Sequence, residues 1–215
     1  MINVKSRISY RTALAAAALA LLVADPAFAH HMMGGKLPQT FGQGLLSGLA
    51  HPIIGLDHLA AIIGAGMIAA LIGRGFAPVL AFTTAMIAGV MLHVARADIP
   101  AAELLVGLST ALIGVVIVFR AGFAVLPVAI LFALTGILHG YALGESIVGA
   151  ESTPLGAYLA GLLVIQSLIA AGAFVVTKIV AVKGRSLGPV ALRVAGAAIA
   201  LVGGAAAAMA AGVIG

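Results

Sequence analysis

The residues of this chain that could do chemistry in an apolar environment appear first between His51 and His58. This segment reads His-Pro-Ile-Ile-Gly-Leu-Asp-His and opens a long apolar stretch that runs to about Gly73. An ionisable group at membrane depth costs about 3 kcal/mol or more unless it is paired or liganded, so such groups indicate a functional site. Neutral imidazole and carboxylate suit a borderline divalent ion such as nickel, cobalt or zinc. We therefore take His51, Asp57 and His58 as candidate metal ligands, with Asp57 either binding the ion or orienting an imidazole.

The spacing of this motif predicts how a helix would present it. His51 and His58 are seven residues apart, which on one α-helix places them within about 20° of a common face. Pro52 lacks an N–H and fits the first helical turn. Gly55 leaves room for a neighbouring helix or an ion to approach. The motif is thus expected to open the first membrane helix.

The composition defines the class of protein that must position these residues. The chain of 215 residues is 63% hydrophobic and 8% charged, with a mean hydropathy of +1.26, which excludes a water-soluble globule and indicates an all-α integral membrane protein. Its 28 glycines favour close helix packing in the lipid bilayer. Because the sequence has no cysteine, any metal is bound by nitrogen and oxygen. The basic stretch 178–193 is interpreted as a topology signal and not as a nucleic-acid site.

The first 29 residues are predicted to be a cleavable secretory signal peptide. A basic region, a short apolar core and a small-x-small cleavage site follow one another at Lys5 to Arg11, at 12–24 and at Ala27 to Ala29. The apolar core is too short to span a bilayer comfortably, although an uncleaved seventh helix is the alternative. Cleavage after Ala29 would leave His30 and His31 near a free amine, where they are weaker metal candidates.

Six apolar windows then predict a single membrane transport domain over residues 30–215. The expected helices are 53–73, 77–95, 101–119, 122–143, 154–177 and 192–214, each about 20 residues long, as a bilayer requires. A signal peptide would place the mature N terminus in the periplasm and the chain in the bacterial inner membrane. The cytoplasmic segments then carry most of the basic residues, as the positive-inside rule requires: Arg74, Arg120, Lys178, Lys183, Arg185 and Arg193.

With this topology the remaining ionisable residues fall toward one side of the membrane. His93 and His139 lie near the outer ends of their helices, Glu103 begins the third helix from outside, and Glu145 follows the fourth. We therefore expect these four residues to share one periplasm-facing metal site with His51, Asp57 and His58. The alternative is that each histidine is satisfied separately by a nearby carbonyl group.

Three other polar residues have simpler explanations. Gln166, in the middle of the fifth expected helix, is expected to hydrogen-bond to another helix, with the lining of a path as the alternative. Tyr141 and Tyr158 lie near the expected outer interface, where aromatic side chains commonly anchor helices.

These motifs resemble those of the HupE/UreJ family of nickel and cobalt permeases. The pattern His-Pro-x-x-Gly-x-Asp-His after a signal peptide is similar to the first family motif, and the segment from His139 to Glu145 is similar to the second. Leu143 stands where a second histidine is common, and Glu145 follows Gly144 directly. Glu103 and Ser109 resemble the family pattern in the third helix.

The resemblance implies secondary uptake of Ni²⁺ or Co²⁺, with no permanently bound cofactor, for the maturation of metalloenzymes such as urease or hydrogenase. The chain has no Gly-x-x-x-x-Gly-Lys-[Ser/Thr] loop and so no phosphate-binding loop of that kind for using ATP. The resemblance to a permease family also implies that the chain is not an enzyme. Two alternatives remain open: a membrane-embedded zinc-dependent hydrolase, and a non-transporting metal receptor or assembly factor.

Overall fold

The computed structural model describes residues 36–73, 75–119, 124–184 and 187–214, and every regular element in these ranges is helical. The helices are α2 (Phe41–Ile54), α3 (Leu56–Ile72), α4 (Ala77–Val94), α5 (Ala102–Phe119), α6 (Val125–Gly144), the 3-10 turn η2 (Glu145–Ile147), α7 (Ser152–Lys183) and α8 (Leu187–Ala210). The expected signal peptide, His30 and His31 lie outside the described residues.

The described helices have the length and composition of a membrane protein. Five of them are long and apolar enough to cross a bilayer, and α2 with α3 forms a bent pair that makes a sixth candidate span. Large apolar side chains such as Leu112, Leu134 and Leu168 are exposed on the outside of the bundle. In a bilayer these side chains face lipid, so the expected membrane class is confirmed, with five or six candidate spans.

The beginning of the membrane domain differs from the expectation. Instead of one helix from residue 53, a separate helix begins at Phe41, where the Thr40 hydroxyl accepts a hydrogen bond from the N–H of Gln43 at 3.3 Å. The chain then turns by 81° between α2 and α3. Pro52 lies in the last turn of α2 and not in the first turn of a helix, so the prediction of a single helix through the motif is wrong.

Pro52 and Gly55 explain the break. Pro52 has no N–H to donate within the helix, which weakens the last turn of α2. Gly55 adopts φ −74° and ψ 104° and ends α2, where its N–H donates to the carbonyl of His51 at 3.2 Å. Its own carbonyl accepts the N–H of Leu59 at 2.9 Å and so starts α3. Gly55 therefore caps both helices, and His51 and His58 lie on different helices.

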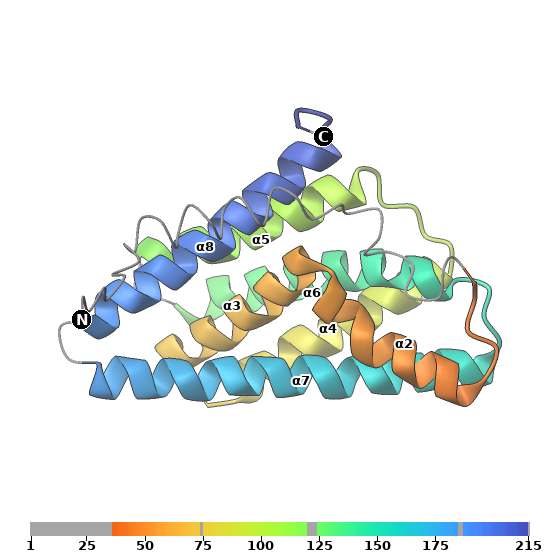
Figure 1. The fold of residues 1–215 in the computed structure, drawn as a ribbon, viewed down its shortest axis with the longest axis horizontal. Helices are drawn as coiled ribbons and strands as arrows, with labels where there is room; N and C mark the ends of the chain where they lie inside the picture. The colour runs from red at the N-terminus through yellow and green to blue at the C-terminus, as the bar shows by residue number, and fades with distance from the viewer. Residues whose placement is uncertain (1–35, 74, 120–123, 185–186, 215) are drawn as a thin grey trace, which may run out of the picture.

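The helices associate as three close pairs, α2 with α7, α4 with α6, and α5 with α8, and α3 contacts α5, α7 and α8 (Figure 1). Glycines allow the backbones of each pair to touch. A Cβ atom at Gly48 would overlap the carbonyl of Tyr158, one at Gly140 the carbonyl of Met86, and one at Gly114 the backbone of Ala200. This agrees with small-residue packing in membranes.

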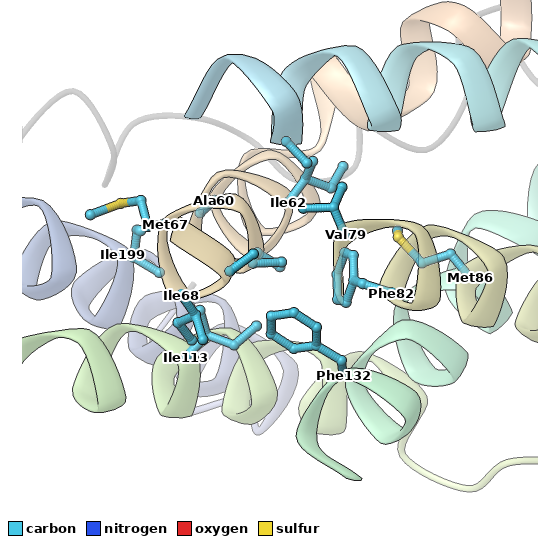
Figure 2. Packing of buried hydrophobic residues seen from close by; sticks show 14 of the residues in the cluster. Ala60, Ile62, Met67, Ile68, Val79, Phe82, Met86, Ile113, Phe132 and Ile199 are labelled. Carbon is cyan, nitrogen blue, oxygen red and sulfur yellow. The ribbon is translucent and has the colours of Figure 1, made fainter. Parts of the chain in front are cut away.

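The packed core surrounds α3. Ile62 and Ile68 of α3 are fully buried, and Phe82 and Phe132 meet edge to face with ring centroids 5.5 Å apart (Figure 2). Such aromatic pairs and buried aliphatic groups hold the helices by dispersion contacts. The polar residues of α3 lie in its first turn, so α3 can contribute polar side chains to a functional site only at that end.

The remaining helix boundaries follow the sequence closely, with two exceptions. Helix α8 runs from Leu187 to Ala210 instead of the expected 192–214, so it begins and ends earlier in the chain. Helices α4 to α6 begin and end within three residues of the expected positions, whereas α7 has 32 residues instead of the expected 154–177. A helix of this length is about 48 Å long, against about 30 Å for a bilayer core. Its last turns carry Lys178 and Lys183, so α7 continues beyond the hydrocarbon region.

Candidate metal site

The centre of the candidate site is a direct contact between two buried imidazoles. His58 lies in the first turn of α3, and His139 lies near the end of α6. Their Nδ1 atoms are 2.8 Å apart, and the ring centroids are 5.0 Å apart in an edge-to-face arrangement. Each ring is almost completely buried, with 2% and 0% exposure. One Nδ1 must donate and the other accept, so a single proton joins the pair.

Hydroxyl groups of α5 fix the other nitrogen of His139. Ser109 Oγ and Thr110 Oγ1 both lie 3.2 Å from its Nε2, and each hydroxyl donates to the carbonyl of Val106. With their protons on that carbonyl, the two oxygens accept from Nε2–H of His139. We therefore assign the proton of His139 to Nε2, and its Nδ1 accepts from His58.

The third imidazole, His51, approaches from the end of α2. Its ring centroid is 6.4 Å from that of His58, and its Nδ1 lies 3.0 Å from Ser146 Oγ and 3.3 Å from the Tyr158 hydroxyl. The Tyr158 hydroxyl donates to the carbonyl of Leu143 at 2.6 Å. His51 and His58 thus meet because the chain breaks between them, and not because they share a helical face.

Asp57 stabilises the start of α3. Its Oδ1 accepts the backbone N–H of His58 at 2.8 Å, and its backbone carbonyl oxygen lies 3.4 Å from Thr110 Oγ1. A carboxylate in the first helical turn offsets the positive end of the helix dipole. Asp57 therefore orients the backbone that carries His58. Gly55, expected to leave room for a neighbour, is approached by His58 itself, since a Cβ at Gly55 would lie 2.7 Å from its Cδ2.

A second group of polar side chains lies beside the cluster of His51, His58 and His139, along α6. The Nδ1–H of His93 donates to the carbonyl of Tyr141 at 2.6 Å, and the two rings stack with centroids 4.2 Å apart. Because the carbonyl can only accept, the lone pair of a neutral His93 lies on Nε2. A cavity of about 390 Å³ is lined by His93, Glu103, Tyr141, Glu145, Ala101, Ala102, Leu104, Ala142 and Ala210.

The seven candidate residues therefore form two adjacent groups instead of one shared site. His51, His58 and His139 meet at the helix break with Asp57 beside them, while His93, Glu103 and Glu145 line the cavity. Among the described residues, no three histidine or acidic side chains are arranged to hold a metal ion as they stand. In the histidine cluster, the Nδ1 atoms of His58 and His139 bond to each other instead.

Sequence reasoning missed several residues that position these imidazoles. Tyr158, expected to anchor a helix at the interface, is fully buried and lies against His51, and Tyr141 is buried against His93. Ser146 and Thr110 were not expected in the site. The adjacent hydroxyls Ser109 and Thr110 in an otherwise apolar helix are a detectable signal, whereas no local pattern marks Ser146 or Tyr158.

The fold and the site define a multi-helix membrane protein with a buried cluster of imidazole and hydroxyl groups at a broken helix. The model of the HupE / UreJ protein family matches residues 17–206, and the chain belongs to this family. It is also similar to Protein HupE of Rhizobium leguminosarum bv. viciae, with 29% identity over 194 residues that cover 88% of this chain and 93% of that protein. No solved structure matches the chain.

Family membership also confirms that the chain is not an enzyme. The HupE / UreJ family is a family of metal transport and accessory proteins.

Proposed function

We propose that this protein is a secondary permease that carries Ni²⁺, with Co²⁺ as a possible second substrate, inward across the bacterial inner membrane to supply urease or hydrogenase maturation. The observation that carries the proposal is the meeting of His51, His58 and His139, from three different helices, at the break between α2 and α3. Broken helices place ends of helices, and their backbone charges, at ion sites inside membranes. The choice of nickel rests on the family, because imidazole ligands suit both ions.

The helix ends around the cluster favour a cation. The C-terminal end of α2 carries His51, and that of α6 lies just beyond His139, and both ends bear partial negative charge. The positive end of α3 is offset by Asp57. A dication can therefore be accommodated in an otherwise apolar bundle.

The two polar groups form a route of two steps. In this proposal the cavity with Glu103, Glu145 and His93 first receives the hydrated ion, and the histidine cluster then takes it deeper. Binding at the cluster requires His58 and His139 to separate, because their Nδ1 atoms bond to each other at 2.8 Å. A site that must be opened binds less tightly than a preformed one, which suits a protein that releases its substrate.

The membrane potential supplies a driving force for this direction of transport. A dication moving inward gains about 4.6 kcal/mol per 100 mV of inside-negative potential, twice the value for one charge. No further energy source is needed for accumulation.

The proposal is tested by uptake of labelled Ni²⁺, with Co²⁺ as competitor, in cells that express the chain. Wild-type uptake above background is expected, with its loss in His58→Ala and Asp57→Asn at matched membrane abundance. Leu168→Ala, at a lipid-facing side chain, is the control and should transport normally. Metal binding by purified protein without any uptake would contradict the permease and favour a receptor or assembly factor.

A further inference from the structure

Gln166, in the middle of α7, is an unsatisfied polar group inside the bundle. Its side chain is fully buried, and neither its Oε1 nor its Nε2 has a hydrogen-bond partner among the residues that the structure describes. The interhelical hydrogen bond expected from the sequence is therefore absent there. By contrast, the buried hydroxyls of Thr83 and Thr135 donate to carbonyls of their own helices. An unsatisfied buried amide destabilises a fold, so its presence calls for a functional explanation.

The position of Gln166 connects it to the histidine cluster. Tyr158, Leu162, Gln166 and Ala170 are all buried and follow one another at intervals of four residues along α7, which keeps them on one side of the helix. Gln166 is about 12 Å along the helix from Tyr158, which lies against His51. One turn further, Gly66 of α3 meets the carbonyl of Ala170 in direct backbone contact. Gln166 thus lies between the cluster and the point where α3 and α7 close on each other.

We propose that Gln166 is an inner binding station for the transported divalent ion, which it receives after the histidine cluster. This inference rests on the proposed permease function. The amide oxygen is an uncharged metal ligand. It can bind the dication directly, or it can accept a hydrogen bond from a water molecule that stays bound to the ion. Such a ligand holds a nickel-like ion less strongly than imidazole, so it favours onward release instead of capture. In this proposal the amide has no partner among the described residues because its partner is the passing ion.

The test compares Gln166→Leu and Gln166→Glu with the wild type, purified and reconstituted in liposomes that contain a Ni²⁺-sensitive dye, under an inside-negative potential. Gln166→Leu should lower the uptake rate about tenfold or more, the loss expected when one interaction with a charged group is removed. Its Ni²⁺ affinity at the outer histidines should be unchanged, and its Tm equal or higher, because an unsatisfied amide has been removed. Gln166→Glu keeps an oxygen atom that can bind the metal ion, so this variant should retain uptake.

Ser167→Ala, a change in the neighbouring residue of the same helix, is the matched control and should transport like the wild type. Normal uptake by Gln166→Leu would overturn the inference, as would an equal loss in Gln166→Glu with unchanged folding. If Gln166→Leu fails to fold, Gln166→Met provides the same comparison with a flexible side chain. Absence of uptake by the wild type would instead contradict the permease function itself, so the two failures are distinguishable.

Discussion

At the scale of single residues, His139 is held at both ring nitrogens by side chains of other helices. His58 contacts its Nδ1, and Ser109 and Thr110 contact its Nε2. Partners of this kind orient a metal-binding imidazole and commonly change metal affinity by about 10- to 100-fold when they are removed. We expect the double variant Ser109→Ala/Thr110→Val to bind Ni²⁺ at least about tenfold more weakly, as measured by titration calorimetry on purified protein.

Thr135→Val is the control for this prediction. Thr135 is also buried and lies on α6 with His139, but its hydroxyl donates to the Leu131 carbonyl of its own helix. The control should bind Ni²⁺ like the wild type. An unchanged affinity in the double variant would show that the two hydroxyls do not orient His139 for metal binding.

The residue types of the site could be predicted from the sequence, but their partners could not. Histidine and acidic side chains inside apolar helices are costly, so His58, His139 and Glu103 stand out in any reading of the chain. Ser146 and Tyr158 carry no such signal, because a hydroxyl is tolerated in many membrane positions. Their contacts with His51 depend on how the end of α2 packs against η2 and α7, which local sequence does not determine.

At the scale of elements, the break at Gly55 positions the first motif. Gly55 has a φ of −74°, which alanine also adopts, so Gly55→Ala should leave the backbone unstrained. Its new Cβ would lie 2.7 Å from Cδ2 of His58 and push the ring away from His139. We expect strongly reduced Ni²⁺ uptake at normal membrane abundance, measured with labelled ion in cells.

Gly42→Ala is the matched control, because Gly42 also lies in α2 and a Cβ there would meet nothing within 4 Å. It should transport normally and be slightly more stable, since alanine favours a helix by about 1 kcal/mol over glycine. Normal uptake by Gly55→Ala would contradict the role of the break in placing His58.

The break was missed from the sequence because its signals are ambiguous. Pro52 is compatible with the first turn of a helix as well as with an irregular last turn, and apolar residues continue on both sides of Gly55. Tertiary contacts determine that the helix breaks here. Gly44 packs against Pro154 of α7, and Gly48 packs against Tyr158 of the same helix, so α2 is held as a separate element. The straight helices α4, α5 and α6 have no such ambiguity, and their bounds were predicted closely.

At the scale of the whole molecule, alternation of helix direction brings the polar residues together. His58 and Tyr158 lie near the beginnings of α3 and α7, whereas His93 and His139 lie near the ends of α4 and α6. Successive helices that cross a bilayer alternate in direction, so these positions fall on one side. The sequence predicts the same shared side, because this prediction depends only on the order of the helices and not on their packing.

Which side of the membrane carries the cluster can be measured on α7 alone. Glu151 precedes α7 near Tyr158, and Lys183 ends it, with about 48 Å of helix between them. Because the chain has no cysteine, Glu151→Cys and Lys183→Cys each create a unique label site. We expect a membrane-impermeant maleimide to label Glu151→Cys in intact spheroplasts and Lys183→Cys only after lysis, with uptake assays verifying that both variants remain functional.

The side of the membrane that carries the cluster matters because of the membrane potential. A dication that moves inward lowers its free energy by about 4.6 kcal/mol per 100 mV of inside-negative potential. That force can load the histidine cluster directly only if the cluster faces the periplasm, where the ion starts at the positive side. The opposite labelling pattern would place His51, His58 and His139 toward the cytoplasm. The ion would then have to pass Gln166 before it reached the imidazoles, and capture at the first motif would be wrong even if the protein transports nickel.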